Sequence, residues 1–258
     1  MNTPQHLTIL TGASRGMGLA MARQLLAPDR LLLCLSRQSS EDLTREASEK
    51  AAPLIQWSQD LAQTESAAQR LQEWLQTQNP ANLLSATLIN NAGVLTTIGP
   101  LEAAPTQGVI NALRVGLEAP MLLTAAFLRV TGEWVQHGWR GPRKVLNISS
   151  GLGRHAMAGQ ASYCAAKAGL DHFTRGTALD EAEKPQGAKL VSLAPGVIDT
   201  DMQTQLRAGD PAVFPALDRF IGLKQQGQLS SPDQAARQVL AWLDRADFGT
   251  EPVADVRQ

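Results

Sequence analysis

Three side chains near the middle of the chain could together deliver a proton: Ser150, Tyr163 and Lys167. The alanine-rich segment from Gln160 onward favours a helix, in which Tyr163 and Lys167, four residues apart, share one face. A neighbouring ammonium stabilises a phenolate, so it can bring the pKa of a tyrosine, ordinarily near ~10, closer to neutrality. Such a tyrosine is a usable general acid or base. A Tyr-x-x-x-Lys pair is also an ordinary feature of helix surfaces, so its interpretation depends on the elements that position it.

Composition limits the classes of protein to consider. The 258 residues, of which 43% are hydrophobic, suffice for one domain over residues 1–258 with a sizeable core. The net charge of −1, with acids and bases interspersed, predicts no nucleic-acid or anionic-membrane partner. No basic and then apolar leader opens the chain, and no run reaches the ~18 apolar residues of a membrane span, so we expect a cytoplasmic protein. The two cysteines, Cys34 and Cys164, predict neither a disulfide framework nor a metal site.

A glycine-rich stretch follows the first predicted strand, residues 6–11, and precedes an apolar helix over residues 19–26. A strand, a glycine-rich turn and a helix N-terminus in this order bind anions, because backbone N–H groups point outward and the helix dipole favours negative charge. The spacing Gly-x-x-x-Gly-x-Gly differs from the Gly-x-Gly-x-x-Gly fingerprint of dinucleotide folds, but its context is the same. We expect the pyrophosphate of a dinucleotide to bind Gly12, Ser14, Arg15, Gly16, Met17 and Gly18.

The second predicted strand, residues 31–35, ends in Ser36 and Arg37. A dinucleotide fold commonly places an acid near this point to bind the ribose 2′-hydroxyl of NAD, and none occurs before Glu41. Arg15 and Arg37 offer guanidinium groups instead, which pair with phosphate through charge-assisted hydrogen bonds. We therefore predict NADP(H) as the cofactor. The alternative is that Arg37 is merely solvated and that NAD binds.

Strands and helices alternate along the chain, which predicts right-handed βαβ units and a doubly wound, Rossmann-like parallel sheet with helices on both faces. We expect further helices over residues 41–52, 64–78, 107–130, 160–183 and 231–245, and further strands over 54–57, 86–89, 144–148, 189–193 and 251–256. Ligands of such sheets bind beyond the carboxyl ends of the strands. The residues that follow predicted strand ends include Asp60, Leu61, Asn90, Ala92, Gly93 and Ser150.

Two segments depart from this regular alternation. Pro120 should kink or locally break the long helix over residues 107–130, and residues 131–143 are interpreted as a surface connection. Residues 199–229 mix apolar residues with glycines and prolines, a pattern that predicts a mobile lid over a substrate pocket. The alternative is an irregular subdomain.

Taken in order, several motifs resemble the short-chain dehydrogenase/reductase family over essentially the whole chain: Thr11-Gly12-x-x-x-Gly16-x-Gly18, Asn90-Asn91-Ala92-Gly93, Ser150, Tyr163-x-x-x-Lys167 and Pro195-Gly196-x-x-x-Thr200. Ser150 lies 13 residues before Tyr163, the separation used in that family, which favours Ser150 over Ser149. The stretch Tyr163-Cys164-Ala165-x-Lys167-Ala168 and residues 194–203 are similar to its sepiapterin reductase and benzil reductase branch.

The resemblance implies hydride transfer between NADP(H) and a small ketone or dicarbonyl. Tyr163 would act as general acid, Ser150 would position the carbonyl oxygen, and Lys167 would lower the pKa of Tyr163 and bind the nicotinamide ribose. Homodimers or homotetramers are usual in the family. Two alternatives are an NADPH-binding sensor or scaffold without turnover and an NAD-linked alcohol dehydrogenase. Further cofactor contacts are expected from Tyr163 itself and from Pro195, Gly196, Ile198 and Thr200.

The substrate side is expected to be largely apolar. In the sepiapterin-like branch an aspartate near the chain terminus binds substrate, and Asp255 is the candidate for that role here. The other substrate-side candidates are Gly151, Leu152, His155, Met157 and Met202.

One position departs from the family pattern. Where the family has an asparagine that holds a water of the proton relay to the lysine, this chain has Gly116. Asn111 cannot replace it, because five residues of α-helix leave it roughly 140° from the same face. We predict an active enzyme in which Gly116→Asn leaves turnover equal or improved.

Overall fold

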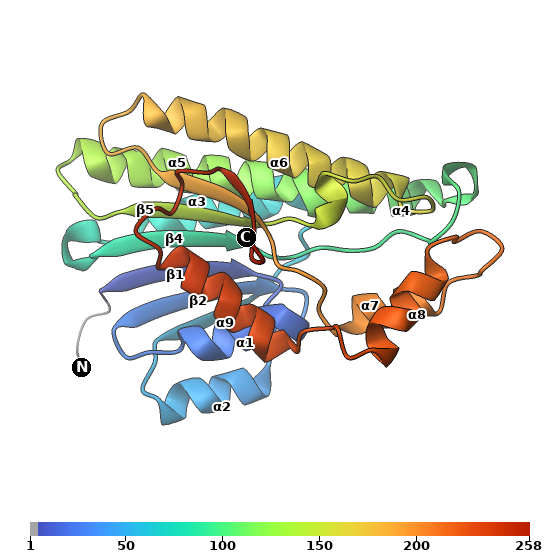
Figure 1. Ribbon diagram of the computed structural model, residues 1–258. Helices are drawn as coiled ribbons and strands as arrows, with labels where there is room; N and C mark the ends of the chain where they lie inside the picture. The colour runs from blue at the N-terminus through green and yellow to red at the C-terminus, as the bar shows by residue number, and fades with distance from the viewer. Residues whose placement is uncertain (1–4) are drawn as a thin grey trace.

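The computed structural model describes residues 5–258, and within them seven strands form one parallel sheet in the order β3-β2-β1-β4-β5-β6-β7 (Figure 1). The sheet is wound outward in both directions from β1 and β4, as the alternation of elements predicts. That reversal is the switch point at which ligands of open parallel sheets bind. The strands are β1 (His6–Thr11), β2 (Arg30–Ser36), β3 (Leu54–Ser58), β4 (Ser85–Asn90), β5 (Arg143–Ile148), β6 (Lys189–Ala194) and β7 (Val253–Asp255).

Helices cover both faces of the sheet. In Figure 1 α1, α2 and α9 lie on one side and α3, α5 and α6 on the other, while α7 and α8 project beside the carboxyl ends of the strands. The predicted fold class is therefore confirmed. The helices are α1 (Gly16–Leu25), α2 (Glu41–Glu49), α3 (Thr64–Gln76), α4 (Thr106–Leu113), α5 (Ala119–Gln136), α6 (Ala161–Ala182), α7 (Asp201–Arg207), α8 (Leu217–Gln225) and α9 (Pro232–Leu243).

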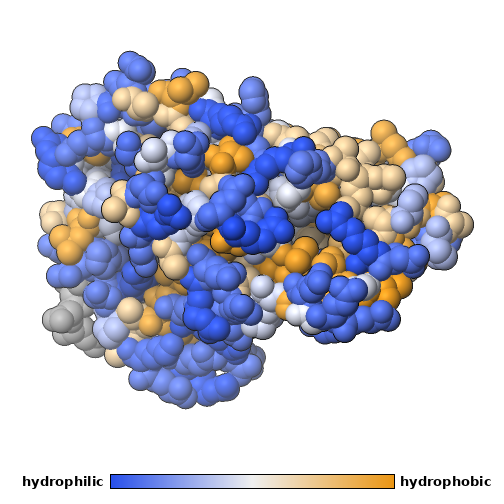
Figure 2. Space-filling view, in the orientation of Figure 1, coloured by the Kyte–Doolittle hydropathy of each residue, from blue (hydrophilic) through white to orange (hydrophobic). Residues whose placement is uncertain are grey.

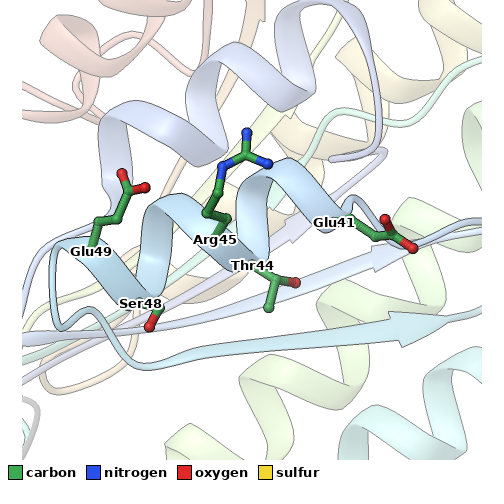
Figure 3. Close-up of a pocket in the computed structure, with 5 residues that line it drawn as sticks. All are labelled: Glu41, Thr44, Arg45, Ser48 and Glu49. Atoms are coloured by element: carbon green, nitrogen blue, oxygen red, sulfur yellow. The ribbon is translucent and has the colours of Figure 1, made fainter.

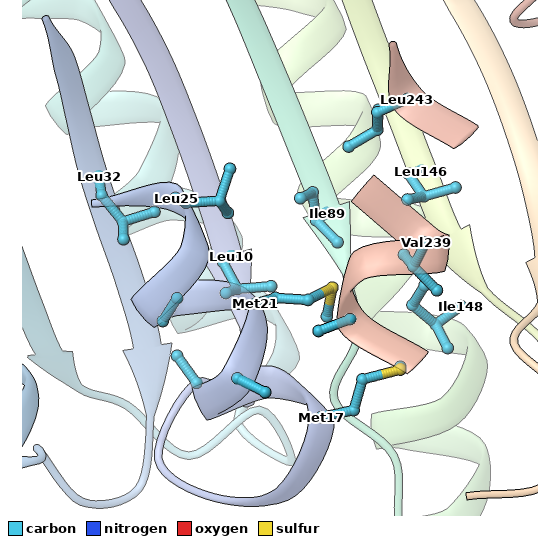
Figure 4. Packing of buried hydrophobic residues seen from close by; sticks show 14 of the residues in the cluster. Leu10, Met17, Met21, Leu25, Leu32, Ile89, Leu146, Ile148, Val239 and Leu243 are labelled. Carbon is cyan, nitrogen blue, oxygen red and sulfur yellow. The ribbon is translucent and has the colours of Figure 1, made fainter. Parts of the chain in front are cut away.

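The continuous apolar runs of the strands follow from burial on both faces. Successive strand residues point to opposite sides, so Leu10 and Leu146 pack against α1 and α9 (Figure 4) while Ile9 and Val145 face α3 and α5. Each of these four side chains has no solvent exposure. The two cores hold the strand ends in a fixed register, which positions whatever side chains follow them.

The long helix predicted over residues 107–130 is interrupted by a wide, π-type turn at Arg114–Glu118. Within this turn the N–H of Ala119 donates to the carbonyl of Arg114, five residues earlier. Pro120, which has no N–H to donate, follows directly and belongs to the first turn of α5. The predicted local break is therefore present, and Gly116 lies inside it.

Helix α5 continues to Gln136, so the interpretation of residues 131–143 as a surface connection was wrong for their first part. Thr131 and Trp134 are buried, and the Thr131 hydroxyl donates to the carbonyl of Phe127 at 2.7 Å. Packing against the core thus overrides the weak helix preference of this stretch.

By length and composition alone, the helical segment Thr106–Gln136 could cross a membrane. Its buried apolar side chains, such as Phe127, pack against the sheet in one of the two cores.

The segment predicted as a lid contains α7 and α8, which share a small core of their own. Phe214 and Phe220 stack with ring centroids 5.6 Å apart, and Leu206 and Leu217 pack around them. Leu95, in the loop after β4, packs against the same cluster. The glycines and prolines that interrupt the pattern lie mostly in the connection between these two helices. Helix α9 starts as predicted, with Pro232 at its first position. The Ser231 hydroxyl caps it by accepting the N–H of Gln234 at 3.2 Å.

Candidate active site

A groove of about 1200 Å³ runs along the carboxyl ends of the strands, between the body of the molecule and the α7–α8 unit (Figure 2). Typical pockets for single small molecules measure roughly 300–1,000 Å³, so this groove can hold a dinucleotide together with a second compound. Two predicted site residues, Asn90 and Asp255, do not line it. The predicted residues that do are Gly12, Ser14, Arg15, Gly16, Met17, Gly18, Ser36, Arg37, Asp60, Leu61, Ala92, Gly93, Ser150, Gly151, Leu152, His155, Met157, Tyr163, Lys167, Pro195, Gly196, Ile198, Thr200 and Met202.

A second hollow lies on the outer side of α2, and one helix alone supplies its walls (Figure 3). Arg45, the one cation in it, is already paired with Asp42 at 2.6 Å. No strand end or glycine-rich turn is among its walls. This hollow is a feature of a solvated helix surface, so the groove is the candidate active site.

Tyr163 lies in the first turn of α6 and is only 9% exposed. Ser150 follows β5 in an extended conformation, and its hydroxyl accepts the N–H of Leu152 at 3.2 Å. Burial raises the pKa of Tyr163 to about 12, while a hydrogen bond with Ser150 opposes the rise. At neutral pH the phenol therefore keeps its proton and is ready to donate it.

Lys167 lies one helical turn beyond Tyr163 and is buried. Its Nζ donates to the carbonyl of Ile148 at 2.7 Å and lies 5.7 Å from the centre of the Tyr163 ring. Burial lowers the pKa of Lys167 to about 8, and Asp171 opposes this. The predicted lowering of the Tyr163 pKa by Lys167 is not found, because desolvation dominates the phenol and the ammonium is turned toward Ile148.

The glycine-rich turn is shaped by two glycines with left-handed backbones, Gly12 (φ 71°) and Gly16 (φ 55°). A Cβ on Gly16 would meet only the Thr200 methyl, at 3.5 Å, so the turn is open to the groove at that point. Gly18 has a different role, since a Cβ there would lie 2.0 Å from the carbonyl oxygen of Gly12. It permits α1 to pack directly on the turn.

Asn91, rather than Asn90, joins β4 to the glycine-rich turn. Its side-chain Nδ2 donates to the carbonyl of Thr11 at 2.9 Å, and its backbone N–H donates to the Thr11 hydroxyl, also at 2.9 Å. Asn90 is buried in the opposite direction, where its Nδ2 donates to Asn147 Oδ1 at 2.8 Å and ties β4 to β5. Adjacent residues alternate in direction at a strand end, and the motif alone could not tell which asparagine faces the groove.

At the end of β2 the groove is lined by a positively charged side chain, Arg37, and by no acidic side chain from that strand end. Arg37 is exposed, lines the groove and makes no ion pair among residues 5–258. The other predicted guanidinium, Arg15, pairs across the groove with Asp201 of α7 at 3.1 Å, an exposed contact that contributes little stability. These features fit a dinucleotide with an extra phosphate: an open glycine turn, a free guanidinium and no carboxylate at the strand end. Over the described chain, no three His, Cys, Asp or Glu side chains are placed to hold a metal ion.

Sequence reasoning missed several polar groups on the substrate side. Gln160 has no solvent exposure, lines the groove, and finds no hydrogen-bond partner for either amide atom within the described chain. Gln203 of α7 is buried with its Oε1 unpaired in the same way. A glutamine has no distinctive sequence signal, so only the fold reveals these groups. The expected apolar lining is therefore interrupted by amides that a polar substrate group could satisfy.

Asp255 is a correction to the sequence prediction. It is buried, and its carboxylate accepts from Arg257 Nε at 2.7 Å and Nη2 at 2.6 Å. Arg257, two residues later, lines the groove in its place. The hydrogen bond from Arg257 is the main cause that lowers the pKa of Asp255. A carboxylate so occupied is not available as a substrate ligand.

Gly116 faces α6, where a Cβ on it would lie 3.1 Å from the Ala166 methyl carbon. Asn111 and Val115 line the groove instead, so Asn111 does not share the direction of Gly116, as the helix geometry predicts. A contact of 3.1 Å is closer than most contacts of a Cβ atom, so this packing argues against the expectation that Gly116→Asn preserves turnover. The helices would have to separate by a few tenths of an ångström beside Tyr163 and Lys167.

We expect Gly116→Asn to lower kcat about 10-fold, because overpacking at the α6 contact would displace Tyr163 and Lys167. Adding Ala166→Gly removes the opposing methyl group and should recover most of the lost rate. Steady-state turnover and thermal melting of the two variants, compared with Ala166→Gly alone, check this. Unchanged turnover in the single variant would show that the helices yield without cost.

Comparison with known proteins agrees with this geometry. A family model described as short chain dehydrogenase matches residues 6–211. Benzil reductase ((S)-benzoin forming) from Bacillus cereus is 37% identical over 93% of this chain and 94% of its own. Sepiapterin reductase from Meriones unguiculatus is 32% identical over 93% of this chain and 92% of its own.

Two solved structures share the fold at lower identity. A 3-oxoacyl-(acyl-carrier protein) reductase from Brucella melitensis in complex with NAD gives a TM-score of 0.79 at 23% identity, covering 99% of this chain and 96% of that one. A metagenomic short-chain oxidoreductase in complex with NADP gives 0.70 at 24%, covering 98% and 95%. Their cofactors differ, so the fold alone does not choose between NAD and NADP. The chain belongs to the short-chain dehydrogenase/reductase family, near its benzil and sepiapterin reductases, and is an oxidoreductase of CH–OH or C=O groups.

Proposed function

We propose that this protein is an NADPH-dependent carbonyl reductase that acts on a small, largely apolar ketone or dicarbonyl. The observation that carries the proposal is the buried, protonated Tyr163 beside Ser150 and Lys167, in the same groove as the open glycine turn and the unpaired Arg37. The relative from Bacillus cereus is a benzil reductase that forms (S)-benzoin, which makes an aromatic diketone the first substrate to test.

The cofactor would be held by the turn from Gly12 to Gly18, by Arg37 and by Lys167, and when bound it supplies a hydride to the carbonyl carbon. Ser150 would hold the carbonyl oxygen through its hydroxyl. Tyr163 would then donate its phenolic proton to that oxygen as negative charge develops on it. The proton passes from Tyr163 Oη to the product alcohol, and the phenolate that remains takes up another from solvent in the groove.

The electrostatics of the site suit the reductive direction. A phenol whose pKa is about 12 is almost fully protonated at neutral pH, so every enzyme molecule begins the cycle with a proton to give. The positive charge of Lys167 would stabilise the phenolate once it forms. Charge on the lysine is lost as the pH rises through its pKa of about 8, so reduction should weaken at alkaline pH.

We also propose that residues 199–229 cover the bound substrate as a lid. That the protein forms a homodimer or homotetramer stays a prediction.

The test is NADPH and NADH oxidation measured side by side with benzil, 1-phenyl-1,2-propanedione and sepiapterin. We expect turnover with at least one diketone and a kcat/KM at least 10-fold higher with NADPH. If NADPH binds, as followed by its fluorescence, while no carbonyl compound is reduced, the sensor or scaffold alternative is correct. Equal or better use of NADH would overturn the choice of cofactor but leave the reductase in place.

Replacing Arg37 by glutamine should raise the KM for NADPH about 10- to 100-fold and leave the KM for NADH unchanged. The reason is that a charge-assisted hydrogen bond to phosphate contributes about 1.5–3 kcal/mol to binding. NADH has no 2′-phosphate, so it does not form this hydrogen bond and its binding does not depend on Arg37. Arg45→Gln is the matched control, because Arg45 is an exposed arginine outside the groove. An equal rise for both cofactors would mean that Arg37 does not read the phosphate.

A further inference from the structure

A row of alternating charges runs from the catalytic lysine to the last strand. Lys167 is followed one helical turn later by Asp171, whose Oδ2 lies 3.4 Å from Arg154 Nε. Arg154 Nη1 lies 3.8 Å from Asp255 Oδ2, and Asp255 is held in turn by Arg257. Four of these groups take no direct part in the proposed chemistry. Their arrangement joins α6, the turn after β5 and β7.

Asp171 is the least solvated member of the row, with 2% exposure. Its Oδ1 accepts the Ser192 hydroxyl at 2.6 Å, whereas its Oδ2 has no hydrogen bond in the described residues, and Arg154 Nε lies within ion-pair distance but outside hydrogen-bond geometry. A buried carboxylate is costly without a counter-charge. A Cβ on Gly153 would lie 2.8 Å from that Oδ2, so the turn after Ser150 packs directly on the carboxylate.

Arg154 directly follows that turn. The turn begins at Ser150, whose carbonyl accepts the N–H of Gly153 at 3.0 Å, and the N–H of Arg154 donates to Gly151 at 3.1 Å. The guanidinium then reaches across to β7, where Nη2 donates to the carbonyl of Ala254 at 2.7 Å. One side chain therefore fastens the turn that carries Ser150 to both α6 and the last strand.

We propose that Arg154 is a positioning residue: by compensating buried Asp171 and gripping β7, it holds Ser150 in register with Tyr163 and Lys167. The inference rests on the proposed reductase function and deepens it. Asp255 then acts on catalysis through Arg154, without touching the substrate, which replaces the substrate-binding role expected for it. Residues of β7 then affect turnover, because Ala254 and Asp255 bind the Arg154 side chain that holds the turn in place.

The same row sets the charge of Lys167. Burial favours the neutral amine, and the Asp171 carboxylate opposes it. The other charged or titratable groups in this neighbourhood include Tyr163 and Cys164 on the same helix and Arg154 on the turn. The end of β5 presents the carbonyl of Ile148 to Lys167, the loop after β4 presents Gly93 to Lys167, and β6 presents the Ser192 hydroxyl to Asp171. Removing the Asp171 charge should therefore move the loss of the Lys167 proton to lower pH.

The experiment is a double-mutant cycle of Arg154→Met and Asp171→Asn, with kcat, KM and pH profiles measured on the diketone that the parent reduces. Arg154→Met should lower kcat about 10- to 100-fold with little change in the KM for NADPH, because it loosens the turn and leaves Asp171 uncompensated. Asp171→Asn alone should shift the alkaline limb of the pH profile to lower pH. The double variant should be more active than Arg154→Met, since the buried carboxylate that lost its guanidinium is then replaced by a neutral amide.

Arg154→Lys, which keeps the charge, should retain most of the activity if Arg154→Met fails to fold. Arg245→Gln breaks an exposed pair with Asp247 outside the groove and is the control that should change nothing. A parent that reduces no carbonyl compound would sink the proposed function itself. An active parent with a fully active Arg154→Met variant, or an unshifted pH profile in Asp171→Asn, would overturn the role of Arg154 and Asp171 alone.

Discussion

Replacing Tyr163 by phenylalanine is expected to lower kcat by about 10²- to 10⁴-fold while leaving NADPH binding unchanged. The phenolic hydroxyl is the proposed proton donor, and the side chain that carries it is buried beside Ser150 at the wall of the groove. Phenylalanine fills the same buried space, so the fold should be kept. Stopped-flow NADPH oxidation and fluorescence titration of the cofactor measure the two quantities separately.

The control for this prediction is Ser150→Ala, which removes a hydrogen bond to the carbonyl oxygen but keeps the proton donor. Its loss of kcat should not exceed the lower end of that range, about 10²-fold. A phenylalanine variant as active as the parent would rule out Tyr163 as the general acid. Loss of NADPH binding in that variant would instead assign the tyrosine to cofactor binding.

Replacing Gly18 by alanine should destabilise the protein by about 3 kcal/mol and abolish NADPH binding. The added Cβ would lie 2.0 Å from the Gly12 oxygen and 2.6 Å from Asn91 Nδ2. The first of these is backbone, so no rotamer change can relieve the contact. The turn and α1 would have to move apart, and the row of N–H groups that faces the pyrophosphate would be lost.

Thermal melting and NADPH titration check this second prediction. Gly176→Ala is its matched control, because Gly176 lies in α6 with no atom within 4 Å of the added Cβ, and alanine is the better helix former. That variant should melt slightly higher than the parent. A Gly18→Ala protein with normal stability and cofactor affinity would contradict the close packing of α1 on the turn.

The parts of the fold that the sequence predicts well are those in which local pattern and packing agree. Strand β1 has the predicted bounds, and the helix that carries Tyr163 differs from prediction by one residue at each end. Here apolar runs, glycines and the prolines that flank helices all favour the same structure. The groove likewise collects almost every predicted residue, since the carboxyl ends of parallel strands share one edge.

The failures share a different cause. The pKa of Tyr163 depends on desolvation, the direction of Asn90 on strand alternation, and the availability of Asp255 on a partner two residues away. None of these is a property of residue type or spacing. Gln160 adds a further case, because an orphaned amide is defined only by what surrounds it.

The α7–α8 unit is held together by a small core of its own, which bears on how ligands enter and leave the groove. Its aromatic cluster around Phe214 and Phe220 is separate from the two large cores of the sheet and buries far fewer apolar side chains. Local opening costs less free energy than global unfolding when fewer apolar contacts are lost. If this unit is the lid that we propose, two free energies govern this protein: a large one for unfolding the sheet, and a smaller one for opening the α7–α8 unit so that ligands enter and leave while the sheet stays folded.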